Sequence, residues 1–125
     1  MIKKNKIYLI DSQDAVFGNE AYDLASLIDD VRIKIKLKNR EKIYKKFISK
    51  QNKINPEKLR NDFEILSILR NLKIIGIFTR LSKRDKKHKY LKLIPYAWKM
   101  IDERRKHNTR FEELNNFLST YFQKI

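Results

Sequence analysis

The sequence predicts a mainly α-helical protein with one short β-strand near its N-terminus. Apolar residues recur at steps of three and four over most of the chain, which is the period of a helix that buries one face. Only two Gly and two Pro occur among the 125 residues, so few positions are suited to turns. The apolar share of 42% is enough for a buried core, and the length fits a single domain.

The N-terminal stretch differs in character from the rest of the chain. Residues 6–10 are rich in β-branched and aromatic side chains, which predicts a strand, and a polar run that contains Gly18 follows them. We therefore divide the chain into a strand-and-loop segment, 1–19, and a helical segment, 20–125, within one domain overall.

Two helices are predicted in the first half of the helical segment. A helical period that begins at Ala21 continues to Ile35, which predicts a first helix over 20–37. A second group of apolar side chains at helical spacing predicts a shorter helix over 43–48.

The third predicted helix has a well-marked start. In Asn55-Pro56-Glu57 the first side chain can cap the helix, Pro suits the first helical position, and an acid favours the first turn. The apolar period then continues for about six turns, to Phe78. Gly76 lies inside this helix and costs roughly 1 kcal/mol relative to Ala, which indicates close packing against a neighbouring element.

Two further helices are predicted after a basic stretch. Apolar residues over 94–101 predict the fourth helix, with Pro95 in its first turn. The last helix is expected to open with a capping box from Thr109 to Glu112. The predicted core of the C-terminal helices consists of Phe63, Leu66, Leu69, Leu72, Trp98, Ile101 and Phe117.

The formal net charge of +15 suggests nucleic-acid binding as one possible function. However, the lysines are scattered along the whole chain, and the densest cluster lacks the interleaved aromatic residues of a single-strand binding surface. That cluster contains Lys83, Arg84, Lys86, Lys87, His88 and Lys89. We keep non-specific nucleic-acid binding as an alternative and expect no specific nucleic-acid partner.

The absence of Cys bears on the compartment. The sequence offers no disulfide, no thiolate metal site and no Cys nucleophile, which favours a reducing environment. The apolar run over 7–10 is too short for a signal peptide or a membrane span. We therefore expect a cytoplasmic protein with no membrane partner.

The most informative stretch is residues 8–27, YLIDSQDAVFGNEAYDLASL. A strand that ends in Asp11, a polar turn with a second acid, and a helix that opens with Ala-Tyr-Asp-Leu resemble a segment of the aminoglycoside phosphotransferase and choline kinase superfamily. A second block, residues 70–91, is similar to the C-terminal helical region of these proteins. Within the superfamily, the chain most resembles the bacterial anomeric kinases of the cell-wall amino sugars N-acetylmuramate and N-acetylglucosamine. The resemblance implies the C-terminal helical subdomain of a protein-kinase-like fold, with the strand as a remnant.

The resemblance implies roles for four residues of the first block. Asp11 stands where such kinases place the carboxylate that binds Mg²⁺, the ion that bridges the phosphates of ATP. Gln13 and Asp14 are possible members of the same metal loop, although an amide binds Mg²⁺ weakly and Asp14 also suits a turn. Asp23 corresponds to a carboxylate that supports the catalytic loop, and its alternative role is to stabilise the N-terminus of a helix.

The second block implies a set of possible acceptor-binding residues. In these kinases the C-terminal helices form the acceptor side of the cleft, and arginine suits contact with carboxylate or phosphate. A solvated helix face with ion pairs is the alternative interpretation. The set comprises Arg70, Asn71, Arg80, Arg84 and Asp85.

The catalytic loop of these kinases, His-Gly-Asp, has no counterpart in the sequence. In the family it precedes the position of Asp11, and neither His88 nor His107 begins a His-x-Asp pattern here. The sequence also lacks a nucleotide-binding lobe with its Gly-rich loop. We therefore expect a truncated lobe that is inactive alone, binds neither Mg²⁺ nor ATP tightly, and has a chain with the nucleotide lobe as a possible partner. A helical protein-interaction module is the alternative.

Overall fold

The computed structural model describes the backbone of residues 2–3 and 6–7, and both backbone and side chains of residues 17–51, 54–106 and 108–122. These residues form five α-helices, two short 3-10 helices and a two-stranded hairpin. The prediction of a mainly helical protein is therefore confirmed.

The hairpin consists of β1, Ile2–Lys3, and β2, Lys6–Ile7. The two strands are antiparallel, with Ile2 opposite Ile7 and Lys3 opposite Lys6. The strand predicted over 6–10 therefore begins where expected, and its last three residues lie outside the described part of the chain.

Helix α1, Ala21–Ile28, is much shorter than the helix predicted over 20–37. Its last turn closes when the N–H of Asp29 donates to Ala25 O at 2.9 Å, and Asp29 then leaves the helical region with φ −107° and ψ 35°. The chain turns at Asp30, whose Oδ1 accepts from the N–H of Arg32 at 2.8 Å. The apolar period that suggested a longer helix arises in part because Val31, just beyond this turn, is also buried.

Helix α2, Leu37–Ile48, begins earlier than the helix predicted over 43–48. It follows an extended residue, Lys36, with ψ 141°. The first turns of α2 carry mostly exposed charged side chains, so their hydrophobic pattern is weak. This is why the sequence pattern detected the second half of the helix alone.

Helix α3, Pro56–Asp85, is the longest element at 30 residues. Its predicted start is confirmed, because the side chain of Asn55 accepts from the N–H groups of Glu57 at 2.9 Å and Lys58 at 3.2 Å. The helix ends at Lys86, a left-handed residue with φ 55°. The N–H of Lys87 then donates back to Leu81 O at 3.0 Å, which closes the C-terminus of the helix.

The C-terminal part contains α4, Ile94–Arg105, and α5, Glu112–Tyr121, preceded by the 3-10 helices η1, His88–Leu93, and η2, Thr109–Phe111. The capping box predicted at Thr109 is wrong. The cap is one residue earlier, where the side chain of Asn108 accepts from the N–H of Arg110 at 3.0 Å. An amide side chain at Asn108 competes with the Thr hydroxyl for this role, and Asn is the stronger cap.

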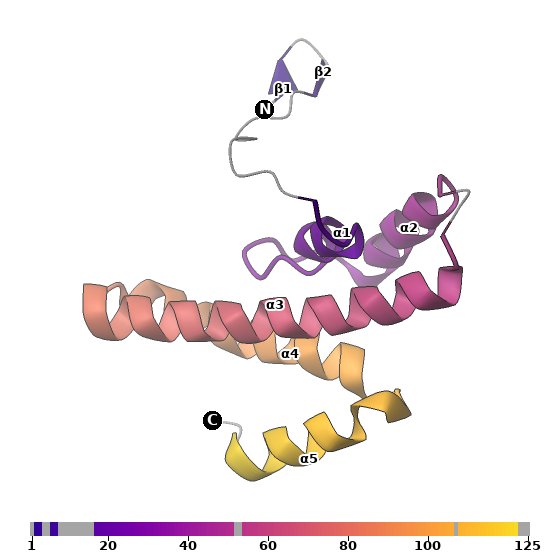
Figure 1. Cartoon of the computed structure of the whole chain (residues 1–125). Helices are drawn as coiled ribbons and strands as arrows, with labels where there is room; N and C mark the ends of the chain where they lie inside the picture. The colour runs from indigo at the N-terminus through magenta and orange to yellow at the C-terminus, as the bar shows by residue number, and fades with distance from the viewer. Residues whose placement is uncertain (1, 4–5, 8–16, 52–53, 107, 123–125) are drawn as a thin grey trace.

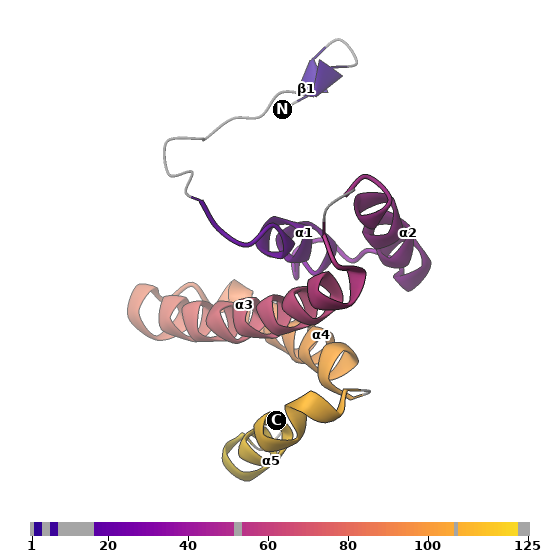
Figure 2. The same ribbon diagram turned by 45° about the vertical axis from the view of Figure 1, so that its right-hand side comes forward.

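Helix α3 is the axis of the helical segment (Figure 1), with α1 and α2 on one side and α4 and α5 on the other (Figure 2). Three apolar clusters lie along it. The first joins α1, α2 and the start of α3, the second joins the middle of α3 to α4, η2 and α5, and the third joins the end of α3 to η1 and α4. Their most deeply buried members include Ala25, Ile28, Phe63, Ile68, Ala97 and Ile101.

Two residues of the predicted core are exposed. Leu69 on α3 and Phe117 on α5 keep 56% and 53% of their surface accessible. Gly76 also differs from its prediction, because a Cβ added to it would meet no atom within 4 Å. Helix α3 packs against α1 and α4, and the described helices leave Leu69 and Gly76 of α3 uncovered. Within the predicted core, Phe63 and Ile101 are buried, and Leu66, Leu72 and Trp98 are partly buried.

Candidate functional site

The predicted metal loop precedes a tightly anchored stretch of chain. Asp11, Gln13 and Asp14 lie outside the described residues. Shortly after them, Asn19 fixes the start of α1, because its Oδ1 accepts from the N–H of Ala21 at 2.9 Å and its Nδ2 donates to Asp62 Oδ2 on α3 at 2.8 Å. The chain therefore enters the helical segment at a fixed point above the first turns of α3.

Asp23 lies in the first turn of α1, and its side chain is exposed. A carboxylate there interacts favourably with the positive end of the helix dipole, which is worth about 0.3–1 kcal/mol. Its exposure leaves the carboxylate accessible to another polypeptide, so both roles considered for this residue remain compatible with its position.

The possible acceptor-binding set is divided into two groups along α3. Arg70 and Asn71 belong to the middle of the helix, and Arg80, Arg84 and Asp85 to its end. Ten helical residues separate the two arginines that begin the groups, which is about 15 Å along the axis. Along the helix, the two groups are therefore too far apart to bind one small ligand together.

Both residues of the first group are buried or half-buried. Asn71 is fully buried, and its Nδ2 donates to Ser67 O at 2.9 Å. Arg70 is half-buried, and its NH1 lies 3.5 Å from Asp29 O. The Arg70 contact links α3 to the end of α1, whereas the Asn71 hydrogen bond lies within α3.

The second group lies on the surface. Arg84 donates from Nε to Asp85 Oδ1 at 2.6 Å and from NH2 to Asp85 Oδ2 at 3.0 Å. The hydrogen bonds from this guanidinium are the main reason that the pKa of Asp85 is below its ordinary value. Arg80 precedes Arg84 by four residues, so the two arginines share one face of the helix. This face could bind an anionic group.

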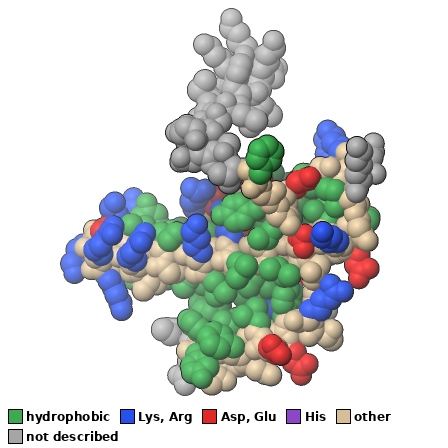
Figure 3. Space-filling view, viewed as in Figure 1, with side chains coloured by type: hydrophobic (Ala, Val, Ile, Leu, Met, Phe, Trp, Pro, Cys, Tyr) green, Lys and Arg blue, Asp and Glu red, His purple; other side chains and the backbone are tan. Residues whose placement is uncertain are grey.

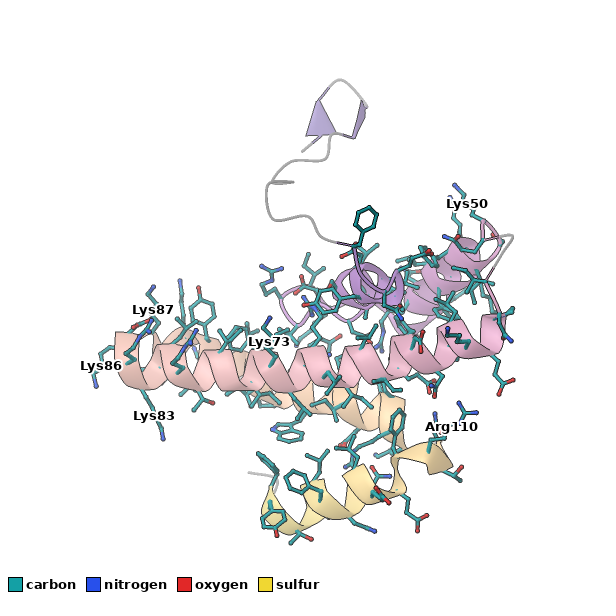
Figure 4. All side chains as sticks on the ribbon, viewed as in Figure 1. Lys50, Lys73, Lys83, Lys86, Lys87 and Arg110 are labelled. Atoms are coloured by element: carbon teal, nitrogen blue, oxygen red, sulfur yellow. The ribbon has the colours of Figure 1, made fainter. Side chains whose placement is uncertain are left out.

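The end of α3 is a basic surface, formed by the cluster recognised in the sequence. Lys83, Lys86 and Lys87 project there in different directions (Figure 4). The chain then folds back, since Tyr90 of η1 stacks on Phe78 with ring centroids 5.2 Å apart. Figure 3 shows Lys and Arg side chains concentrated at this end of the molecule. Such a surface attracts anions without selecting among them.

The most strongly constrained charged group of the described chain is Asp29, which the sequence analysis did not single out. Its carboxylate is fully buried at the end of α1. Arg104 of α4 donates to it twice, from Nε to Oδ2 and from NH2 to Oδ1, both at 2.8 Å. Ser67 of α3 donates to Oδ2 at 2.5 Å, and Arg40 of α2 donates to Oδ1 at 3.3 Å. Arg40 also donates to Glu103 Oε2 at 2.6 Å, so one network joins α1, α2, α3 and α4.

Burial by itself raises the pKa of the Asp29 carboxyl, because it disfavours the charged form. The hydrogen bonds from Arg104 and Ser67, together with the charges of Arg104 and Arg40, outweigh burial and place the pKa below its ordinary value. Asp29 is therefore ionised in the folded protein at neutral pH. This arrangement is structural, since every polar atom of the carboxylate faces a partner within the chain. A signal was present in the sequence, because an acid that directly follows the apolar face of α1 needs a buried partner.

A broad hollow of about 570 Å³ lies beside α4, and its lining includes Glu103 and Arg104 of the same network. Charged side chains of both signs line it, together with Trp98. Among them, Glu41 and Arg60 approach to 3.9 Å and Lys99 and Glu103 also to 3.9 Å. Such a lining can hydrogen-bond a polar ligand, but its charges largely satisfy one another.

Sequence comparison gives this geometry a context. No protein-family model matches the chain. A protein of Caulobacter vibrioides named N-acetylmuramate/N-acetylglucosamine kinase is 28% identical over 97 residues, which cover 78% of this chain. A protein of the same name from Neisseria meningitidis serogroup B is 31% identical over 120 residues, or 91% of this chain. The chain is similar to N-acetylmuramate/N-acetylglucosamine kinases.

The similarity confirms the predicted closeness to these sugar kinases, while placement in the wider superfamily stays a prediction. This chain spans 27% of the length of the Caulobacter kinase and 35% of that of the Neisseria kinase. The helical segment described above is consistent with the C-terminal helical subdomain of a kinase-like protein.

Two further observations concern the described residues alone. Nowhere among them do three or more His, Asp or Glu side chains gather in a way that could hold a metal ion. No helix in the described ranges is both long enough and apolar enough to cross a membrane.

Proposed function

We propose that this chain is the acceptor-side, C-terminal lobe of a sugar-kinase-like phosphotransferase that acts on an amino sugar or a related alcohol. The observation that carries the proposal is the similarity to two N-acetylmuramate/N-acetylglucosamine kinases over most of this chain. None of the 125 residues forms a His-x-Asp pattern. The proposal therefore places the catalytic base and the nucleotide-binding lobe outside these 125 residues.

Asp11, with Gln13 and Asp14, would hold Mg²⁺ in this proposal. Carboxylate and amide oxygens are hard donors of the type that Mg²⁺ prefers, so the chemistry of the donor set suits the ion. When bound with ATP, Mg²⁺ neutralises phosphate charge. What the described residues contribute is position, because Asn19 ties the chain that follows this loop to Asp62 of α3.

The surface arginines at the end of α3 are proposed to recognise the acceptor. N-acetylmuramate carries a carboxylate, and Arg80 could pair with it in a bidentate manner, while Arg84, whose Nε and NH2 donate to Asp85, adds positive charge on the same face. N-acetylglucosamine lacks this carboxylate. An Arg80→Gln variant should therefore weaken binding of N-acetylmuramate more than binding of N-acetylglucosamine, as followed by chemical-shift titration of the two sugars.

The test of the proposed activity is a phosphoryl-transfer assay. This chain is co-expressed with the polypeptide encoded immediately upstream of it, and transfer of the γ-phosphate of ATP to each sugar is followed by chromatography. The mixture is expected to be active and the isolated chain inactive. Asp11→Asn should abolish transfer, whereas Asp30→Asn, a matched change at an acid paired with Arg32 away from the metal loop, should not.

Nucleotide binding provides an independent measurement on the isolated chain. An incomplete set of ligands and the lack of a phosphate-binding lobe should limit the affinity for Mg-ATP to a Kd of about 1 mM or weaker. Calorimetry that found micromolar binding, lost in Asp11→Ala, would contradict the need for a nucleotide-binding lobe outside these 125 residues. Phosphoryl transfer that persisted in the Asp11→Asn mixture would contradict the proposed role of Asp11.

A further inference from the structure

An apolar groove of about 560 Å³ separates the outer face of α3 from α5. Figure 3 shows hydrophobic side chains gathered on this side of the molecule, below α3 and along α5. Its walls include Leu72, Ile75, Trp98, Leu114, Phe117 and Phe122. Grooves lined mainly by aliphatic and aromatic side chains are typical binding sites.

The groove is open to solvent in the described chain. Phe117 and Phe122 keep 53% and 45% of their surface accessible, although their rings contact each other with centroids 6.2 Å apart. Leu69 continues the same face of α3 beyond the groove and is also exposed. Covering partly exposed apolar side chains stabilises a complex, so a partner that covered these three would gain affinity.

Gly76 provides a second, independent observation. It lies inside α3 and lines the groove, although Gly disfavours a helix relative to Ala. No positive φ requires Gly there, and no atom of the described chain lies within 4 Å of an added Cβ. Packing within the chain therefore does not account for it. The missing side chain leaves a notch through which the backbone of another element can approach closely.

The charges at one end of the groove restrict the occupant. Arg80 and Lys83 belong to its lining, and Lys83 projects at the basic end of α3 (Figure 4). The whole chain carries +15, so pairing of two copies through this face would bring like charges together. An acidic partner is favoured by the same charges.

We infer that the groove binds an amphipathic helix of a partner protein, with acidic residues at the end that meets Arg80 and Lys83. The stretch of α3 from Leu72 to Lys83 spans about 16 Å, which matches about three turns of a bound helix. Apolar side chains at positions i, i+3, i+4 and i+7 of that helix would fill the groove, and its backbone would pass over Gly76. This inference uses no step of phosphoryl transfer, but it shares Arg80 with the proposed acceptor site, so a bound helix and the acceptor would compete for that side chain.

The test uses a displayed library of 14-residue helical peptides with Leu or Phe at i, i+3, i+4 and i+7 and Glu at either end. Because the groove has one basic end, binding to the full chain should enrich peptides with Glu at one end over those with Glu at the other. Gly76→Leu should weaken their binding about tenfold or more by filling the notch. Lys83→Glu should weaken it about three- to tenfold. The controls, Ile33→Ser and Lys50→Glu, change an exposed apolar and an exposed basic residue outside the groove lining and should leave binding unchanged.

The Gly76→Leu variant separates binding from folding. Leu favours a helix more than Gly does, so its free energy of unfolding in urea should equal or exceed that of the wild type. A failure to enrich any acidic peptide, or binding that survives both Gly76→Leu and Phe117→Ser, overturns the inference. A dimer in sedimentation equilibrium that Gly76→Leu dissociates would also overturn it, since a second copy would then be the occupant. None of these readouts involves Asp11 or ATP, so their failure is distinct from failure of the proposed function.

Discussion

Replacement of Asp29 by Asn tests the main physical claim about the helical segment. The carboxylate is fully buried and accepts hydrogen bonds from Arg104, Ser67 and Arg40. A carboxamide has one oxygen and one NH₂ group, so whichever way it is turned, its NH₂ faces a donor. Arg40 keeps Glu103 as a partner, but the guanidinium of Arg104 loses its paired charge.

The expected cost of this change is about 3–5 kcal/mol, the usual cost of breaking a buried ion pair from one side. A domain of this size has a total stability of about 5–15 kcal/mol, so the variant should lose a large part of it. Urea unfolding followed by far-UV circular dichroism gives the difference, provided that the slope with denaturant concentration stays the same.

Asp30→Asn is the matched control. The neighbouring carboxylate pairs with Arg32, whose side chain is 68% exposed, so its loss should cost no more than about 1 kcal/mol. If Asp29→Asn were as mild as Asp30→Asn, the network would contribute little, and the account of what joins the four helices would be wrong.

The pH dependence of the stability of the wild type and of Asp29→Asn gives a second readout. Because the folded pKa of Asp29 is lower than its ordinary value of 3.8, its contribution is fully present above that value. It is lost as the pH falls through the folded pKa. The difference in stability between the wild type and Asp29→Asn should therefore be constant near neutrality and should shrink below pH 3.8. A difference that grew on acidification would contradict the sign of the pKa shift.

Three further predictions concern other parts of the chain. Lys86→Gly should relieve a left-handed residue and raise the Tm by about 4 °C in scanning calorimetry, and an unchanged or lower Tm would count against strain there. Asn55→Ala should cost about 1 kcal/mol in urea unfolding, whereas Asn55→Asp should cost a few tenths or less, because both Asn and Asp can accept from the two N–H groups. Affinity for duplex DNA, if measured by fluorescence anisotropy, should fall steeply with salt, and discrimination of about a hundredfold between sequences would contradict a purely electrostatic contact.

The parts of the fold that were predictable from sequence are those fixed by local chemistry. The Asn55-Pro56 start of α3 was correct, because a cap and a helix-compatible Pro act within one turn. Burial of Phe63 and Ile101 was also correct, since each lies on a consistently apolar helix face. The end of α1 was wrong because the buried partners of Asp29 come from residues far away in the sequence.

The candidate site residues also divide into those predictable from local spacing and those that depend on distant parts of the chain. Helical spacing alone places Arg80 and Arg84 on one surface, and the structure agrees. The burial of Asn71 could not be inferred, because it depends on which face of α3 the other helices cover. Gly76 was expected to contact a neighbour inside the chain, whereas the structure leaves that position open. A single-sequence pattern marks Gly76 as unusual inside a helix, but it does not identify what lies against it.

Helix α3 takes part in all three apolar clusters, and this has a consequence for how the protein opens. Each cluster is small, so the three need not melt together, and amide exchange should proceed in separate steps along one continuous helix. Helix α5 belongs to the second cluster and lies outside the Asp29 network, so its detachment would leave α1 to α4 joined. The chain could therefore exchange its last helix for that of another molecule while the remainder stays folded.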